Sequence, residues 1–251
     1  MRPAMALFEA QKVHKRFGDH VVLEEINLSF EEHRLSGIMG PNGAGKTTCF
    51  NVLTGLYKPD RGRVVFDGID ITGKSPGAIA KMGISRSFQV MNVFDEYTAL
   101  DNVLLAVPEV RQRGLHILYD LANDTQSNDK AEQILVRVGL VGKERVQASD
   151  LSYGERRALE IGIALAAEPR ILFLDEPTAG LGTEATAKLA DMVNRIKEGL
   201  TIVIIEHEMN FLFNLADTIN VIQWGQVVAV GTPDELRANP WVKASNLGKL
   251  A

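Results

Sequence analysis

The stretch GPNGAGKT, residues 40–47, predicts the fold more directly than any other part of the sequence. Its glycines allow backbone N–H groups to wrap around a phosphate, Lys46 can reach β- and γ-phosphate oxygens, and the Thr47 hydroxyl can bind Mg²⁺. A predicted strand, residues 35–39, precedes the stretch and a predicted helix follows it. This context favours a nucleoside triphosphate site over a glycine-rich turn with nothing bound. The residues expected to bind the nucleotide here are Gly40, Pro41, Asn42, Gly43, Ala44, Gly45, Lys46, Thr47 and Thr48.

Composition limits the class of protein. The 251 residues suffice for one compact α/β domain or for a domain with an inserted lobe. A net charge of −5 offers no support for nucleic-acid binding. The single cysteine, Cys49, excludes an internal disulfide and fits a reducing compartment. No signal peptide and no apolar stretch of membrane-spanning length is recognisable, so we expect any action on membranes to require a partner.

The pattern along the chain predicts three regions. Short alternating apolar runs between residues 6 and 39 predict antiparallel strands that lead into the buried strand 35–39. Helical periodicity between about residues 88 and 167 predicts an inserted helical lobe. Strands and helices alternate again after that lobe, with a helix over 184–198 and a capping box formed by Thr232 and Glu235.

A second group of chemically important residues lies in ILFLDEP, residues 171–177. Four apolar residues predict a buried strand, and two acids follow at its carboxyl end, where parallel sheets place ligand sites. Asp175 is the expected metal ligand, and Glu176 is the expected general base that polarises the attacking water. A pair of solvated carboxylates is the alternative, which the phosphate loop makes less favourable.

Three single residues complete the predicted site. Gln89 could reach the metal and the attacking water from the end of one strand, and His207 could contact the γ-phosphate from the end of another. For each of them a satisfied polar residue without a catalytic role is the alternative. Phe17 could stack on an adenine ring, with a place in the hydrophobic core as the alternative.

The stretch LSYGERRALEIG, residues 151–162, predicts a second helix start suited to phosphate. Taken in chain order, the aromatic residue, the phosphate loop, the glutamine, LSYGE, LDE and the histidine resemble the ATP-binding subunits of ABC transporters. The resemblance runs from about residue 7 to residue 240. In that family the consensus L-S-G-G-Q binds the γ-phosphate of an ATP held by the other subunit. The resemblance therefore assigns Ser152 and Gly154 to a sister subunit's nucleotide.

The resemblance also implies the fold and the domain limits. The fold is α/β, a P-loop NTPase of the ABC-ATPase type with a RecA-like core, an antiparallel β subdomain and an inserted helical subdomain. Residues 1–251 form one ABC ATPase domain, in which about 6–88 and 166–251 make the catalytic core with the β subdomain. The helical subdomain covers about 89–165.

Activity, cofactors and partners follow from the same resemblance. The expected activity is hydrolysis of ATP coupled to transport, with ATP and Mg²⁺ as cofactors and with Thr47, Gln89 and Asp175 around the metal. The expected partners are a sister ATP-binding subunit in a hetero- or homodimer, two membrane permease subunits and an exported substrate-binding protein, and no nucleic acid. The chain is expected at the cytoplasmic face of the inner membrane as a peripheral subunit.

Within the family the sequence resembles the LivG type, the ATPases of branched-chain and hydrophobic amino-acid importers. The similar stretches include FNVLTGLYKPDRG, DEPTAGLG, IIEHEM and GTPDELRANPWV. Urea and amide importers, lipopolysaccharide exporters and ABC ATPases without a transport role remain alternatives. A metabolic kinase would not explain LSYGE, and a scaffold would not need Lys46 and Glu176.

Three positions depart from the family pattern. Tyr153 and Glu155 replace the consensus Gly and Gln, and neither position needs to carry the phosphate contact. Gly182 stands where the family's D-loop usually has an Asp, which removes a side chain expected to reach across the dimer. By the same resemblance, residues 89–96 should line a groove for a short helix of the membrane subunit. Val93 and Phe94 are its apolar candidates, with a place in the hydrophobic core as the alternative for each.

Overall fold

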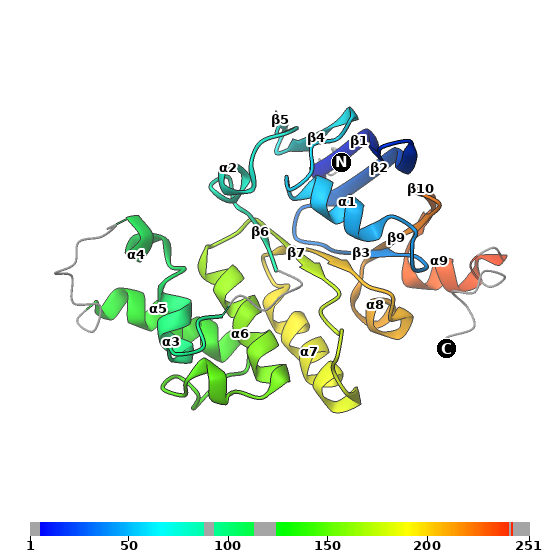
Figure 1. Ribbon diagram of the computed structural model, residues 1–251. Coiled ribbons are helices and arrows are strands. Elements are labelled where there is room, and N and C mark those ends of the chain that lie inside the picture. The colour runs from blue at the N-terminus through cyan, green and yellow to red at the C-terminus, as the bar shows by residue number, and fades with distance from the viewer. Residues whose placement is uncertain (1–5, 88–92, 113–123, 241, 243–251) are drawn as a thin grey trace, which may run out of the picture.

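The structure is a computed structural model that describes residues 6–87, 93–112, 124–240 and 242. Figure 1 shows a small antiparallel sheet at one end, a larger sheet in the middle, and a group of helices at the other end. The larger sheet is the middle layer, because its strands send alternate side chains into two separate hydrophobic cores. Phe173 and Val203 face the core shared with the small sheet, whereas Leu172 and Ile202 face the core shared with the helices.

The small sheet contains β1 (Ala6–Phe17), β2 (His20–Glu31), β4 (Arg61–Phe66) and β5 (Ile69–Asp70). Its strand order is β2-β1-β4-β5, and all of its pairs are antiparallel. Phe8, Phe30 and Phe66 are buried beneath it, and the Phe8 and Phe30 rings pack against Phe173 of the larger sheet. These aromatic contacts attach the small sheet to the layer that carries the site.

The larger sheet has the strand order β10-β9-β3-β8-β7-β6. Its strands are β3 (Leu35–Met39), β6 (Ile84–Arg86), β7 (Ile171–Asp175), β8 (Thr201–Ile205), β9 (Thr218–Gln223) and β10 (Gln226–Gly231). All are parallel except β10, which pairs with β9 in the antiparallel sense. Every residue of β3, β7 and β8 is buried, as expected for parallel strands covered on both faces. Their carboxyl ends therefore meet at one edge.

Five helices belong to the part of the chain around the sheets. They are α1 (Lys46–Leu53), α2 (Pro76–Ala80), α7 (Thr183–Ile196), α8 (Met209–Leu215) and α9 (Pro233–Ala238). Between β6 and β7 lie α3 (Ala99–Leu104), α4 (Pro108–Gln112), α5 (Thr125–Arg137), the 3₁₀ turn η2 (Ala148–Asp150) and α6 (Tyr153–Ala166). We call this second set, with its connections, the helical part. No helix in the described ranges has the length and apolar character needed to cross a bilayer. The predicted fold class is confirmed.

Side-chain caps account for the starts of α3, α5, α6 and α9. Thr232 and Glu235 form the predicted capping box, and the predicted helix over 184–198 runs from 183 to 196. Ser75 is the residue before α2, and its side chain makes no capping hydrogen bond. Helix α2 begins with Pro76 and ends at Ala80. Cys49 lies inside α1, where burial raises the pKa of its thiol to about 12.

Gly40 is required by a close backbone approach. A Cβ atom at this position would lie 2.0 Å from the carbonyl oxygen of Ile222 in β9. We predict that Gly40→Ala lowers the free energy of unfolding by about 3 kcal/mol, because the backbone of one strand must shift to admit the methyl group. Gly77→Ala in α2 is the matched control, since a Cβ there meets no atom within 4 Å. Chemical denaturation of both variants checks this, and equal midpoints would contradict it.

Candidate functional site

The phosphate loop connects β3 to α1 and is built largely from main chain. Gly43 and Gly45 have φ values of 79° and 99°, a conformation that glycine adopts without steric cost. Helix α1 begins at Lys46, so its first N–H groups point toward the loop. Thr47 is exposed in the first turn and Thr48 is half-buried. These features make the loop a cradle of N–H groups suited to phosphate.

Lys46 is buried within this loop. Its Nζ donates hydrogen bonds to the carbonyl oxygens of Gly40, at 2.8 Å, and Pro41, at 3.0 Å. Burial lowers the pKa of Lys46, while the negative charges of Glu176 and Asp175 act in the opposite direction. The ammonium group therefore lies in a pocket of negative charge at the carboxyl edge of the larger sheet.

Asp175 and Glu176 follow each other at the end of β7, as predicted. Asp175 is 2% exposed, and its Oδ1 accepts no hydrogen bond from a described residue. Burial, together with the charge of Glu176, raises the pKa of Asp175 to about 6, against the opposing charges of Arg86 and Arg157. A buried carboxylate oxygen without a donor fits a cation ligand. The described residues contain no group of three or more His, Cys, Asp or Glu side chains that could hold a metal by themselves.

His207 lies at the end of β8, beside Glu176. Its Nδ1 is 3.8 Å from Glu176 Oε1, and 44% of its side chain is exposed. Phe17 ends β1 and is 46% exposed, with its ring edge-on to Tyr57 at 5.5 Å between centroids. The core alternative for Phe17 is thus wrong, because the ring lies on the surface. Gln89 falls outside the described residues.

Glu206 was not among the predicted site residues. It is fully buried between β8 and His207, yet both of its carboxylate oxygens are satisfied. Oε1 accepts hydrogen bonds from the backbone and the hydroxyl of Thr178, and Oε2 accepts from the backbone of His207 at 2.9 Å and of Glu208 at 3.3 Å. Glu206 thus joins the segment after Glu176 to the segment that carries His207. The sequence signal that could have indicated Glu206 is its position, as an acidic residue between a buried strand and a histidine.

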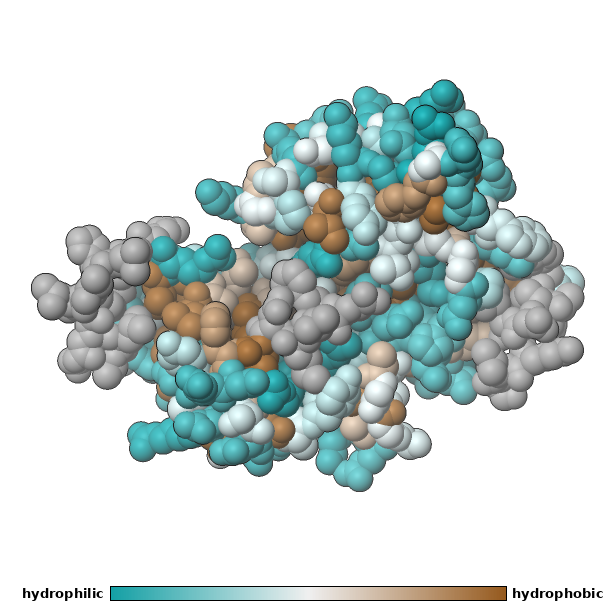
Figure 2. Space-filling view, in the orientation of Figure 1, coloured by the Kyte–Doolittle hydropathy of each residue, from teal (hydrophilic) through white to brown (hydrophobic). Residues whose placement is uncertain are grey.

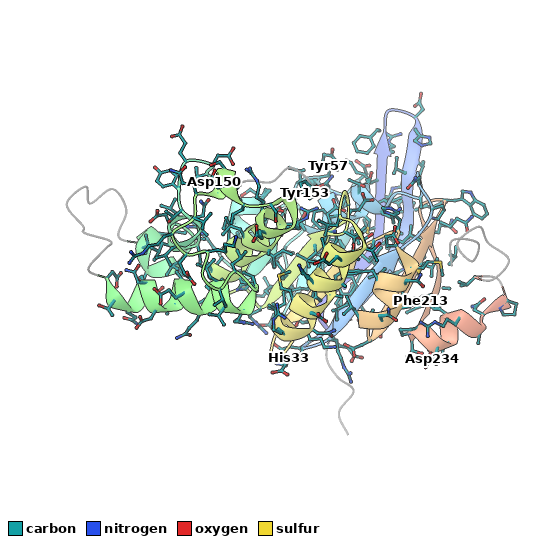
Figure 3. The ribbon with its side chains drawn as sticks, turned by 90° about the horizontal axis from the view of Figure 1, so that it is seen from below. His33, Tyr57, Asp150, Tyr153, Phe213 and Asp234 are labelled. Carbon is teal, nitrogen blue, oxygen red and sulfur yellow. The ribbon has the colours of Figure 1, made fainter. Side chains whose placement is uncertain are left out.

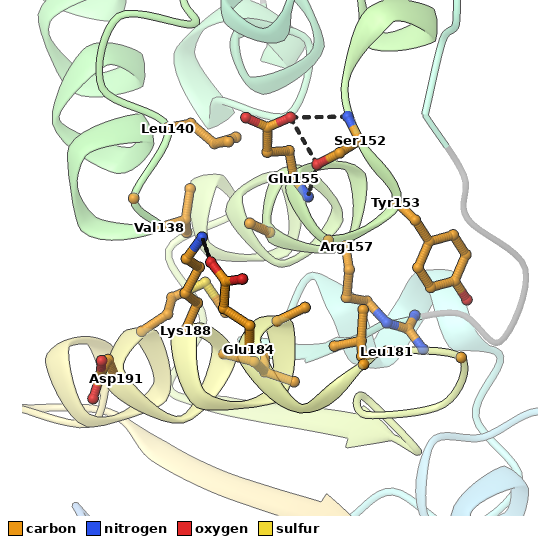
Figure 4. Close-up of a pocket in the computed structure, with 18 of the residues that line it drawn as sticks. Val138, Leu140, Ser152, Tyr153, Glu155, Arg157, Leu181, Glu184, Lys188 and Asp191 are labelled. Atoms are coloured by element: carbon orange, nitrogen blue, oxygen red, sulfur yellow. Dashed lines mark hydrogen bonds and ion pairs between the residues drawn. The ribbon is translucent and has the colours of Figure 1, made fainter.

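The second predicted phosphate-binding helix start belongs to α6. Ser152 precedes the helix and forms a capping box with Glu155, whose Oε2 accepts from the Ser152 backbone at 2.8 Å. Ser152, Gly154 and Gly182 line one groove of about 830 Å³ between α6 and α7 (Figure 4). In the view of Figure 3, Tyr153 lies on the side of the helical part that is nearer to Tyr57 than Asp150 is. This groove does not include the chain's own phosphate loop.

The backbone of Gly182 does not require glycine. Its φ of −78° and ψ of 169° are open to any residue, so the position does not use the conformational freedom of glycine. A Cβ atom there would meet no atom within 4 Å. An Asp side chain would therefore fit at this position. Lack of space does not explain why the chain has no charged side chain there.

A phosphate loop between a parallel strand and a helix, with two acids at the end of a nearby strand, defines a P-loop nucleoside triphosphatase. Residues 23–179 match the family model ABC_tran, described as ABC transporter. The high-affinity branched-chain amino acid transport ATP-binding protein LivG of Escherichia coli (strain K12) is 37% identical over 93% of this chain and 94% of its own length. BraF of Pseudomonas aeruginosa, also described as a high-affinity branched-chain amino acid transport ATP-binding protein, is 36% identical over 97% of this chain and 98% of its own length.

Solved structures agree with this assignment. MJ1267, an ATP-binding cassette of an ABC transporter in its ADP conformation, is 31% identical to this chain, and the two structures superpose with a TM-score of 0.83. The match covers 95% of this chain and 97% of MJ1267. The chain therefore belongs to the ABC transporter family. It is the subunit that binds and hydrolyses ATP, and it works with membrane permease components and as part of a dimer.

The raised pKa of Asp175 makes stability depend on pH. An acid whose pKa is raised by folding favours the folded state below about pH 4 and loses that contribution as pH rises through about 6. We predict that Asp175→Asn raises the free energy of unfolding by roughly 1–3 kcal/mol at pH 8, and that this gain shrinks toward pH 4. Thermal unfolding without nucleotide or Mg²⁺ measures it. Asp191→Asn, an exposed position on α7, is the control; a gain independent of pH would contradict the prediction.

Proposed function

We propose that the chain powers the import of branched-chain or other hydrophobic amino acids. The similarity to LivG and BraF over nearly the whole chain carries this proposal. Its partners are a sister ATP-binding subunit, two permease subunits and an exported substrate-binding protein, and its place is the cytoplasmic face of the membrane. Import of urea or an amide, or export of lipopolysaccharide, would appear in a transport assay as a different substrate.

The site residues divide the chemistry among them. Lys46 and the loop N–H groups hold the β- and γ-phosphates, and Phe17 stacks on the adenine. Thr47, Asp175 and Gln89 hold Mg²⁺, which when bound neutralises charge on the phosphate oxygens. Glu176 accepts a proton from the attacking water, and His207 contacts the γ-phosphate. The closeness of Glu176 to His207 and the unpartnered oxygen of Asp175 support these roles.

The sister subunit completes each site. Ser152 and Gly154 contact the γ-phosphate of the sister's ATP, so two subunits pack head to tail around two nucleotides. Residues 89–165 act as a helical subdomain that rotates as ATP binds. The exposed N-cap of α6, with the first N–H groups of that helix beside it, supports this role because such a helix start attracts phosphate.

Apolar surface on the helical part supports a contact with the permease. Figure 2 shows hydrophobic side chains gathered on the surface of the helical part. Phe94 is 57% exposed and packs edge-on against Tyr97, whereas Val93 is partly buried against the core. We therefore assign Phe94, more than Val93, to the groove that receives the membrane subunit.

Glu176→Gln tests the chemistry. We predict that hydrolysis falls by at least about 10²-fold with ATP binding retained, because the amide cannot accept the water's proton. With ATP and Mg²⁺ the variant should elute as a closed dimer in gel filtration, and its proteoliposomes should not take up leucine, isoleucine or valine. Lys46→Ala, in contrast, should weaken ATP binding by about 10- to 100-fold. Wild-type hydrolysis by Glu176→Gln would refute the assignment.

Gly182 leads to a prediction about the dimer. Because this chain lacks the D-loop carboxylate, we propose that it works beside a non-identical sister and that the two ATP sites turn over unequally. Glu176→Gln here and the equivalent change in the sister should then leave different residual rates of transport-coupled hydrolysis. Gly182→Asp, which has room for the side chain, should bring those rates closer together. Equal residual rates before the substitution, or full transport by a homodimer, would contradict the proposal.

A further inference from the structure

Helix α6 contacts the segment that follows β7 at two points. Tyr153 and Arg157 are four residues apart and so lie on one face of the helix. Residues 176–180, which we call the catalytic segment, begin with the proposed general base. Figure 4 shows the Arg157 side chain pointing from α6 toward the ribbon that leads to Leu181. Both contacts therefore join the helical part to the catalytic segment within one chain.

Arg157 holds the main chain of the proposed base. Its Nη2 donates to the carbonyl oxygen of Glu176 at 3.0 Å, and its Nε donates to that of Pro177 at 3.3 Å. Its Nη1 pairs with Glu160 at 2.7 Å, and both side chains are about 95% buried, with exposed fractions of 5% and 4%. A buried guanidinium with fixed geometry defines carbonyl positions more sharply than an exposed one, since it has no water to exchange with.

Tyr153 holds the other end of the catalytic segment. Its hydroxyl donates to the carbonyl oxygen of Ala179 at 3.1 Å. Its ring covers Gly180, where a Cβ atom would come within 3.1–3.3 Å of the ring and the hydroxyl. Gly180 also has a φ of 77°, which disfavours other residues there. The residue that replaces the family's consensus glycine thus packs on the catalytic segment.

The backbone of Glu176 needs such support. Its φ of 44° is in the left-handed region, which is unfavourable for a glutamate. Its N–H donates to the carbonyl oxygen of Ile205 in β8 at 2.8 Å, and its own carbonyl oxygen accepts from Arg157. The strained conformation is therefore fixed by β8 on one side and by α6 on the other, as a strained residue requires.

We propose that Tyr153 and Arg157 are positioning residues that tie the geometry of Glu176 to the start of α6, so that each ATP site responds to the nucleotide in the other. The inference rests on the proposed function, in which Ser152 and Gly154 bind the sister's ATP and Glu176 is the base. Binding at the α6 start moves Tyr153 and Arg157, and their bonds carry that movement to the catalytic segment. Neither side chain has a place in the chain's own phosphate loop.

Tyr153→Phe and Arg157→Lys test this in the full-length chain assembled with the sister and membrane subunits that co-purify with it. Phenylalanine keeps the ring over Gly180 and removes only the hydroxyl. Lysine keeps a positive charge for Glu160 but cannot donate several hydrogen bonds in the fixed planar geometry of a guanidinium. We expect kcat to fall about 3- to 10-fold for Tyr153→Phe and about 10- to 100-fold for Arg157→Lys, with the KM for ATP changed less than about twofold. The Hill coefficient for ATP should move toward 1.

Arg156→Lys is the matched control. Arg156 is the next residue of the same helix, but it bonds to Asp95 and to the carbonyl oxygen of Ala148, away from the catalytic segment. The variant Arg156→Lys should keep the wild-type Hill coefficient for ATP. The inference is overturned if Tyr153→Phe and Arg157→Lys behave like Arg156→Lys, or if their loss of kcat only follows a loss of folded protein in thermal unfolding. If Glu176→Gln hydrolyses ATP normally, the proposed function has failed instead.

Discussion

Close contact between backbones is the constraint on which the site depends. Gly40 lies against the carbonyl oxygen of Ile222, and Gly45 and Gly225 both lie against that of Val22. Val22 belongs to the small sheet, whereas Ile222 belongs to the larger one. The phosphate loop is thus fixed between the two sheets, with a further bond from the Gly225 N–H to the carbonyl oxygen of Ala44. These close approaches at glycine fix the position of the loop that is to hold the phosphates.

Acidic side chains near Lys46 are the second feature on which the site depends. Asp175, Glu176 and Glu206 lie near Lys46, and all of these residues except Glu176 are buried. Glu206 is stabilised by four hydrogen bonds, whereas Asp175 keeps an oxygen without a donor. The two buried acids therefore have opposite uses: one holds the fold together at the site, and the other gives up stability to remain available to a cation.

The sequence was sufficient for features that depend on neighbours in the chain. The phosphate loop, the order of strands and helices, the helix start within residues 151–162 and the capping box at Thr232 follow from local patterns, and the structure contains them. Arg157 and Glu206 were not predicted, because the groups that they bind in residues 176–178 lie 19 to 28 residues away along the chain. The surface position of Phe17 likewise depends on how the two sheets pack, which no local pattern specifies.

Lys46 has a kinetic consequence. Its ammonium group already has two acceptors inside the loop, the carbonyl oxygens of Gly40 and Pro41, so the shape of the loop does not depend on a ligand for support. Arrival of a nucleotide therefore exchanges the hydrogen bonds of this amine and leaves the fold of the loop in place. Rebuilding of the loop then adds no step when ADP gives way to ATP.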